Sequence, residues 1–254
     1  MKNATDFATE KMPLRGSMLK FFVECPLRYE LTLGTDRVAN GPMETGSAVH
    51  WLIEEFERTK SPIGEKHYKQ AEKKWPQATP DAIREYFAGY ARKAGELTAK
   101  YGSVIGIETQ GTTRLAPAKI DPTQKEIVIN GTWDQLRALE GDDGVFTYNL
   151  IDFKVSTQPI ADMIKTYALQ LASYTIGVGQ KFNTDKVKCF VANPLLMAKP
   201  RSMFIYPAKF TIAKCNRLLD IVRLHIAAIR SGVTPAIAGY SCKYCPKRSP
   251  ENCS

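Results

Sequence analysis

The chain has 254 residues, of which 44% are hydrophobic and 24% charged, and this is enough to bury one sizeable core. Its formal net charge of +9 suits a polyanionic partner, although many basic proteins bind none. No apolar run reaches the roughly 18 residues of a membrane span and the first residues lack a signal-peptide core, so we expect a soluble protein of the cytoplasm.

The first part of the chain, residues 17–101, has the apolar spacing of amphipathic helices. Ser17 can cap the first of them, and the last two are more polar, so we expect those two to be more exposed. The predicted helices cover residues 17–31, a stretch that opens at Gly46-Ser47, residues 64–75 and residues 80–101.

The middle of the chain, residues 102–231, becomes rich in Val, Ile and Thr, which favour strands. Turn signals at 121–122 and 141–144 separate the first three strands. The predicted order is strands at 104–115, 126–132 and 145–155, a helix at 160–178, strands at 186–192 and 202–207, and an amphipathic helix at 209–231. No linker or repeat divides the chain, so the pattern predicts one α/β domain over 1–254 with a cysteine-bearing tail at 232–254.

Two acids and a lysine lie on adjoining apolar segments, 131–134 and 150–154. Because alternate residues of a strand face the same side, Asp152 and Lys154 should point one way and Phe153 the other. Packing gives no reason for an acid and a lysine on one face of so apolar a strand. Metal-dependent hydrolysis of a phosphodiester requires such a set.

In this hypothesis Asp134 and Asp152 bind Mg²⁺ or Mn²⁺, and the carbonyl of Phe153 can add a backbone ligand. Lys154 positions the attacking water and stabilises charge in the transition state. An Asp–Lys surface pair on an edge strand is the simpler interpretation of so short a motif. The preceding Gly-x-x-Asp and the residues below favour the metal site.

Four further polar residues are candidates for this site. His50 lies early in an apolar helix and can bind a metal or carry a proton, or it can make one hydrogen bond in a partly buried position. Glu108 is an acid on an apolar strand, and it either joins the site or is exposed. Gln170 and Tyr174 share a helix face just after the lysine and can bind the phosphate backbone or hold Lys154, although a helical tyrosine is more often a core residue.

The six cysteines are not expected to form disulfides inside a cell. Cys242, Cys245 and Cys253 form a close group near the C-terminus, and Cys25 is the best candidate for a fourth ligand. Thiolates at this spacing bind an iron–sulfur cluster or Zn²⁺, and such a set would join the two ends of the chain. The other two lie in apolar patterns typical of the core: Cys189 and Cys215.

Together these motifs resemble the RecB-like branch of the PD-(D/E)XK nuclease superfamily, and within it the iron–sulfur members such as the AddB nuclease domain and the CRISPR-associated exonucleases. The motif order extends over most of the chain, although Trp133 stands where the superfamily name has proline. The matching segments are Ser17-x-Leu19-x-x-Phe22-x-x-Cys25-Pro26-x-Arg28-Tyr29, Gly46-x-x-x-His50, Gly131-x-x-Asp134, Ile151-Asp152-Phe153-Lys154, Gln170-x-x-x-Tyr174, and Cys242-x-x-Cys245 with Cys253.

The resemblance implies an αβββαβ core with a mixed sheet, an N-terminal helical insertion and a C-terminal tail bound to a cluster. It implies a metal held by His50, Asp134 and Asp152, with Lys154 catalytic. Gln170 and Tyr174 would support the site. A structural [4Fe–4S] cluster would be held by Cys25, Cys242, Cys245 and Cys253, although the gap before the last cysteine is slightly long.

The activity that the resemblance implies is a metal-dependent DNA exonuclease favouring single-stranded ends, in a bacterial, archaeal or phage-infected cell. A non-catalytic nucleic-acid-binding subunit and a structure-specific endonuclease remain as alternatives. Residues 41–47 resemble a phosphate-binding loop, but no lysine follows the second glycine, so we expect no ATP site. A helicase or recombination protein could be a partner that supplies the motor.

Overall fold

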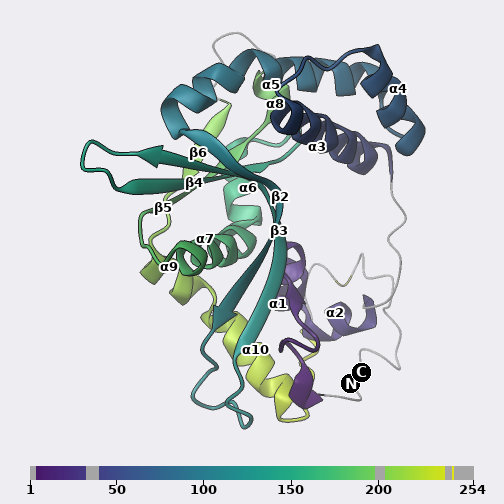
Figure 1. The fold of residues 1–254 in the computed structure, drawn as a ribbon. Helices are drawn as coiled ribbons and strands as arrows, with labels where there is room; N and C mark the ends of the chain where they lie inside the picture. Colours follow the sequence, from purple (N-terminus) through teal and green to yellow (C-terminus); the bar gives the residue numbers. More distant parts are fainter. Residues whose placement is uncertain (1–3, 33–39, 198–203, 238–241, 243–254) are drawn as a thin grey trace.

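The computed structural model describes residues 4–32, 40–197, 204–237 and 242. Within these ranges six strands form one mixed sheet with helices on both faces, which confirms the predicted α/β fold class (Figure 1). The strands are β1 (Leu14–Arg15), β2 (Ser103–Leu115), β3 (Ile127–Glu140), β4 (Phe146–Phe153), β5 (Val187–Ala192) and β6 (Ile205–Ala208).

Strand β3 organises the sheet because three other strands pair with it. β2 runs antiparallel along one edge of β3, from Ile127 to Ala138. The opposite edge is shared, since β4 pairs antiparallel with residues 135–140 and β1 pairs parallel with Ile129 and Asn130. Asp134 therefore lies where the pairing with β4 has ended and the pairing with β1 has not begun. β5 then pairs parallel with β4, and β6 antiparallel with β5.

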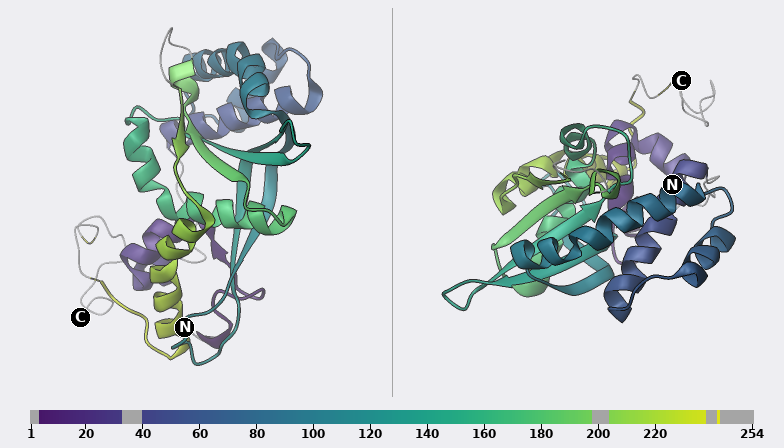
Figure 2. Two further views of the ribbon diagram at one scale, coloured as in Figure 1. Left: turned by 90° about the vertical axis from the view of Figure 1, so that its left-hand side faces the viewer. Right: turned by 90° about the horizontal axis from the view of Figure 1, so that it is seen from above.

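The helices fall into groups at the two ends of the long strands (Figures 1 and 2). One group consists of α3 (Gly41–Thr59), α4 (Glu65–Lys74), α5 (Pro80–Tyr101) and the short α8 (Pro194–Met197). At the other end are the 3₁₀ helices η1 (Ala4–Asp6) and η2 (Gly16–Met18), with α1 (Leu19–Glu24), α2 (Pro26–Thr32) and α10 (Asp220–Arg230). Between the groups, α6 (Ile160–Thr166) and α7 (Ala168–Phe182) connect β4 to β5, with α9 (Ile212–Leu218) beside α7.

Both faces of β4 are buried, each in a different apolar cluster. Ile151 and Phe153 pack with α3, α4 and α5, whereas Leu150 packs with α6 and α7 around Trp133. A third cluster joins α1, α9 and α10 at the far end of the sheet. Asp152 alternates with Ile151 and Phe153 and therefore points toward α7. None of the helices in the described part of the chain is long and apolar enough to cross a bilayer.

Three predicted helices are interrupted. The one expected over 17–31 divides at Cys25, which is extended (φ −163°, ψ 99°) because the following proline disfavours helical backbone. The ones expected over 160–178 and 209–231 divide at Tyr167 and Leu219. One non-helical residue leaves the apolar spacing nearly unchanged, so periodicity could not reveal these breaks. Ser17 lies in η2 and does not cap α1.

Several element boundaries also differ from the prediction. α3 begins earlier, at Gly41, because the side chain of Asn40 accepts the N–H of Met43 and a proline occupies the first turn. β3 continues to Glu140, because its partners on both edges extend it. β4 ends at Phe153, so Lys154 directly follows the strand. α5 is less exposed than predicted: Ile83, Phe87, Tyr90, Leu97 and Tyr101 are buried.

Candidate active site

Three acids lie in one row across the centre of the sheet. The register pairs Gln135 of β3 with Ile107 of β2 on one edge and with Ile151 of β4 on the other. One step along, Glu108 and Asp134 lie between consecutive β2–β3 pairs, and Asp134 and Asp152 each lie just beyond the last β3–β4 pair. The row consists of Glu108 on β2, Asp134 on β3 and Asp152 on β4.

The backbone is irregular at this row. Glu108 has a φ of 43°, which is uncommon for a residue other than glycine. Residues two apart in a strand normally share a face, yet Trp133 packs in the cluster with α7 while Gln135 donates a hydrogen bond to Tyr90 of α5. The alternation of β3 therefore changes phase at Asp134. Such departures from regular geometry concentrate at functional sites.

His50 of α3 joins two of these acids. His50, Glu108 and Asp134 each place a ligand atom within 4.8 Å of the others. The imidazole Nδ1 is 3.3 Å from Glu108 Oε1 and 3.8 Å from Asp134 Oδ2, and Nε2 is 3.1 Å from the carbonyl oxygen of Phe153. Burial acts to lower the pKa of His50, but the charge of Asp134 and the hydrogen bond and charge of Glu108 raise it to about 9.

Half-buried Lys154 and buried Asp152 form an ion pair beside this group. Lys154 Nζ donates to Asp152 Oδ1 at 3.0 Å and is 2.8 Å from Oδ2. Burial raises the pKa of Asp152, with Lys154 acting against it. Burial acts to lower the pKa of Lys154, but the charges of Asp152 and Asp134 raise it above its ordinary value. The lysine is therefore held as a cation among the acids.

The donor atoms of this site fit a divalent metal ion. Asp152 Oδ2 is buried with Lys154 Nζ 2.8 Å away, and Asp134 Oδ2 accepts the N–H of Phe153 at 2.6 Å. A carboxylate has about four acceptor lone pairs, so these contacts leave both carboxylates able to bind a metal as well. Carboxylate oxygens with an imidazole nitrogen and a nearby backbone carbonyl suit Mg²⁺ or Mn²⁺. Asp152 lies outside the three-residue group, and Glu108, which the sequence left open, lies inside it.

Gln170 and Tyr174 of α7 approach the site from one face of β4, and α5 covers the other face. Gln170 Nε2 is 3.3 Å from Asp152 Oδ1 and 3.2 Å from the hydroxyl of Tyr174. The tyrosine ring packs against two glycines, because a Cβ added at Gly16 or Gly131 would lie 2.7 or 2.4 Å from its Cε1. The glycine of the Gly-x-x-Asp motif therefore makes room for Tyr174, a role that the sequence did not reveal.

The site opens on a cleft of about 730 Å³. His50, Glu108, Phe153 and Lys154 line one part of it. The other part is lined by residues that the sequence analysis did not single out, among them Met43, Trp51, Lys74 and Trp75. The sequence offered one signal for this part, the position of Trp51 directly after His50. Another cavity, of about 750 Å³ beneath α5, contains lysines but none of the three metal-ligand candidates.

A model of the PD-(D/E)XK nuclease superfamily matches residues 16–249. The chain belongs to the PD-(D/E)XK nuclease superfamily. These nucleases act on DNA and usually use divalent metals, which agrees with the donor set described above. The matched range includes Asp134, Asp152 and Lys154.

The fold resembles that of a solved structure. A "putative exonuclease" from Eubacterium rectale aligns with a TM-score of 0.55 at 18% identity, over 98% of this chain and 87% of that chain. A second structure, of SSO0001, aligns at 16% identity over 93% of this chain and 98% of that chain, with a TM-score of 0.37. No curated protein sequence matches the chain.

The cysteines are partly described. Cys25 precedes α2, and its sulfur accepts the N–H of Arg28 at 3.4 Å. The N–H of Leu27 donates to the carbonyl of Pro235 at 3.2 Å, so the chain at Pro235 lies beside α2. Two predicted ligands lie outside the described residues: Cys245 and Cys253. Two cysteines are buried in the core, as predicted: Cys189 and Cys215.

Proposed function

We propose that this chain is a metal-dependent DNA exonuclease of the RecB-like branch that hydrolyses phosphodiester bonds from single-stranded ends in the cytoplasm. One observation carries the proposal. Three potential ligands, His50, Glu108 and Asp134, converge within 4.8 Å beside the Asp152–Lys154 ion pair. The formal charge of +9 is compatible with a nucleic acid partner.

His50, Asp134 and Asp152 would hold Mg²⁺ or Mn²⁺, and Glu108 adjoins them. When bound, the metal supplies charge neutralisation at the phosphate and lowers the pKa of a bound water. Lys154 remains a cation next to these carboxylates, where it can orient the attacking water and stabilise negative charge that develops on the phosphate.

The residues around these groups would keep them in place. Gln170 donates a hydrogen bond to Asp152 and also contacts Tyr174, so the two α7 side chains restrict the carboxylate that pairs with the lysine. The carbonyl of Phe153 contacts His50 Nε2 and lies beside the other proposed ligands. Preorganised donors of this kind need little rearrangement when charge develops in the transition state.

We also propose that Cys25, Cys242, Cys245 and Cys253 hold a structural [4Fe–4S] cluster. Cys25 supports this, because hydrogen bonds to sulfur help to tune cluster thiolates. Thr234 Oγ1 also donates to Glu30 Oε2 at 3.2 Å, a second contact between α2 and the segment before Cys242. An anaerobic preparation should be brown, with about four irons per chain. A colourless, fully active protein loaded with zinc would instead support structural Zn²⁺.

The decisive assay compares end-labelled linear single-stranded, linear duplex and closed circular DNA, with Mg²⁺ or Mn²⁺ and with EDTA. We expect metal-dependent digestion of the linear single strand and none of the circle. Lys154→Ala should lower the rate by about 10²–10³-fold, as for the loss of one charge-stabilising donor. Lys165→Ala is the control, since this α6 side chain is 81% exposed.

The assay also separates the competing activities. Normal digestion by purified Lys154→Ala would reject the role proposed for that lysine. Cleavage of the closed circle would indicate an endonuclease. Salt-sensitive binding without cleavage in any metal would indicate a non-catalytic binding subunit.

A further inference from the structure

One wall of the cleft consists of aromatic side chains that the hydrolytic roles do not use. Trp51 follows His50 on α3, and Trp75 directly follows α4. Their ring centroids are 6.0 Å apart, with an angle of 53° between the planes. Both side chains are half-buried, because they pack against the cluster of α3, α4 and α5 and also line the cleft.

A positive charge accompanies these rings. Lys74 is exposed, its Nζ lies 4.6 Å from the centroid of the Trp75 ring, and it lines the same cleft as Lys154. Proteins that bind single strands combine aromatic faces, on which bases stack, with cations that follow the phosphates. The cleft therefore has both components next to the group of acids that would bind the metal.

We propose that Trp51 and Trp75, together with Lys74, form the subsite that stacks an unpaired base beside the phosphate to be cleaved. This inference rests on the proposed function, because it takes the scissile phosphate to lie at His50 and Asp134. The volume of about 730 Å³ lies within the roughly 300–1,000 Å³ of sites that enclose a small ligand. A nucleotide fits such a space.

The same subsite gives a physical reason for a preference for single strands. The faces of a base inside a duplex are already covered by its neighbours, so that base must be unstacked before it can lie against Trp51 or Trp75. Unstacking and unpairing cost a few kilocalories per mole. A base at a single-stranded end has no pairing partner, so moving it onto a tryptophan ring costs less free energy. The wall would therefore select unpaired DNA without reading its sequence.

A purely structural role for the tryptophans predicts different behaviour. If the rings only seal the core between α3 and α4, their removal should lower stability and leave DNA affinity unchanged. If they stack a base, affinity for unpaired DNA should fall when leucine replaces them and recover when tyrosine does. A leucine retains apolar packing, whereas only the aromatic variant retains a flat face for stacking.

The test measures the tryptophan fluorescence of the full chain in EDTA, where no digestion occurs, during titration with a short oligothymidylate or a blunt duplex. The chain has three tryptophans, and the third, Trp133, is only 1% exposed. Quenching by DNA thus reports on Trp51 and Trp75. We expect oligothymidylate to quench the emission much more than duplex does.

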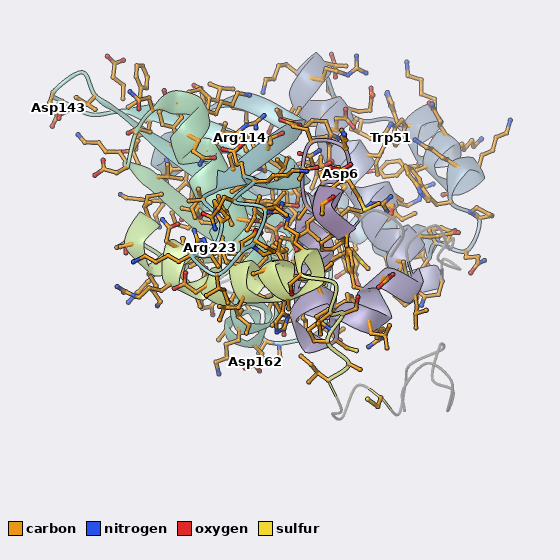
Figure 3. The ribbon with its side chains drawn as sticks, turned by 90° about the horizontal axis from the view of Figure 1, so that it is seen from below. Asp6, Trp51, Arg114, Asp143, Asp162 and Arg223 are labelled. Carbon is orange, nitrogen blue, oxygen red and sulfur yellow. The ribbon has the colours of Figure 1, made fainter. Side chains whose placement is uncertain are left out.

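Variants then show which side chains bind the oligothymidylate. Trp51→Leu and Trp75→Leu should each weaken oligothymidylate binding about tenfold, the scale of losing one base–aromatic stack, and the tyrosine variants should restore most of it. Phe146→Leu is the aromatic control: this residue is 42% exposed and belongs to the β3–β4 hairpin, whose Asp143 lies far from Trp51 (Figure 3). Lys74→Ala should reduce the salt dependence of binding more than Lys73→Ala does.

The outcomes for stacking and for hydrolysis are distinct. Wild-type emission that does not respond to oligothymidylate, or leucine variants that bind it as the wild type does, would overturn the stacking subsite even if the wild type digests DNA. Quenching with tenfold losses in both leucine variants, but no metal-dependent digestion by the wild type, would support stacking and reject the proposed hydrolysis. If the leucine variants fail to fold, the wild-type titration tests the stacking subsite: equal quenching by oligothymidylate and duplex would reject it.

Discussion

Replacement of Gly131 by alanine tests the packing that holds Tyr174 next to the candidate active site. A Cβ at position 131 would lie 2.4 Å from Tyr174 Cε1, 2.7 Å from its hydroxyl oxygen and 2.8 Å from Cζ. Favourable carbon–carbon contact begins at about 3.5 Å, so the ring or strand β3 must move by about 1 Å. Tyr174 is only 4% exposed, and Gly16 also packs closely against its Cε1, so little free space is available.

The magnitude follows from this clash. Overpacking a filled core costs about 1–3 kcal/mol. In a chain of this size each kcal/mol lowers the melting temperature by about 2–4 °C, so we expect a loss of several degrees. The rate of DNA digestion should fall by more than unfolding explains, because a displaced Tyr174 loses its contact with Gln170, which bonds Asp152.

Thermal unfolding followed by circular dichroism and digestion assayed well below the melting temperature measure the two effects. Gly95→Ala is the control: a Cβ there meets nothing within 4 Å on an exposed part of α5, so alanine should stabilise by about 0.5–1 kcal/mol. Adding Tyr174→Leu to Gly131→Ala removes the clash, so the combined loss should be less than the sum of the single losses. A Gly131→Ala protein as stable and as active as the wild type would refute the reasoning.

Three further predictions concern other parts of the molecule. Arg230→Met should lower the free energy of unfolding, measured by chemical denaturation, by about 3–5 kcal/mol. The substitution leaves Asp121 without its cation in an ion pair whose two side chains are fully buried. A loss within the range of surface substitutions, below about 0.5 kcal/mol, would contradict this. The affinity of the metal-free protein for Mn²⁺ should rise with pH up to about 9, because a metal binds only the neutral imidazole of His50. Burial acts to lower the pKa of His50, but the charge of Asp134 helps to raise it to about 9. Calorimetric affinities that do not change between about pH 6.5 and 8.5 would show that His50 releases no proton on binding. Cys25→Ser should lower both the iron content and the melting temperature, since metal binding contributes to the free energy of folding; an unchanged iron content would exclude this cysteine as a ligand.

The relation between Asp152 and Lys154 could be predicted from sequence because strand alternation is local. The two side chains lie on the same side and pair at 2.8 Å, with Phe153 in the cluster on the other face. Glu108 could not be placed in this way. Its position depends on the long-range register of β2 with β3 and on a φ of 43°, neither of which is encoded by neighbouring residues alone.

Residues that only long-range packing brings together were the ones the sequence analysis missed. Trp51 and Trp75 are separated by α4 and each resembles an ordinary core tryptophan, so no local pattern indicates that both line one cleft. The contact between Gly131 and Tyr174 likewise joins β3 to α7. The Gly-x-x-Asp motif included Gly131, and the packing explains why glycine is needed there, since a side chain would clash with Tyr174.

A buried polar network behind the site links the helix of His50 to the strand of Asp134. Glu57, on the same helix as His50, accepts a hydrogen bond from Tyr90 of α5 and lies 3.7 Å from Arg137 Nη2 of β3. Gln135 of β3 connects the other two, donating to the Tyr90 hydroxyl at 2.9 Å and accepting from Arg137 Nε at 2.7 Å.

This network is a costly way to gain stability, since buried ion pairs seldom repay their desolvation and Arg137 Nη2 has no hydrogen bond. It is an effective way to fix geometry, because α3, α5 and β3 must keep their relative positions for its bonds to form. We therefore interpret the network as a device that holds His50 against Asp134. Glu57→Gln, which removes the charge but keeps the shape, should weaken Mn²⁺ binding although Glu57 is not a proposed ligand. Unchanged Mn²⁺ affinity in a folded Glu57→Gln protein would show that the position of His50 does not depend on this network.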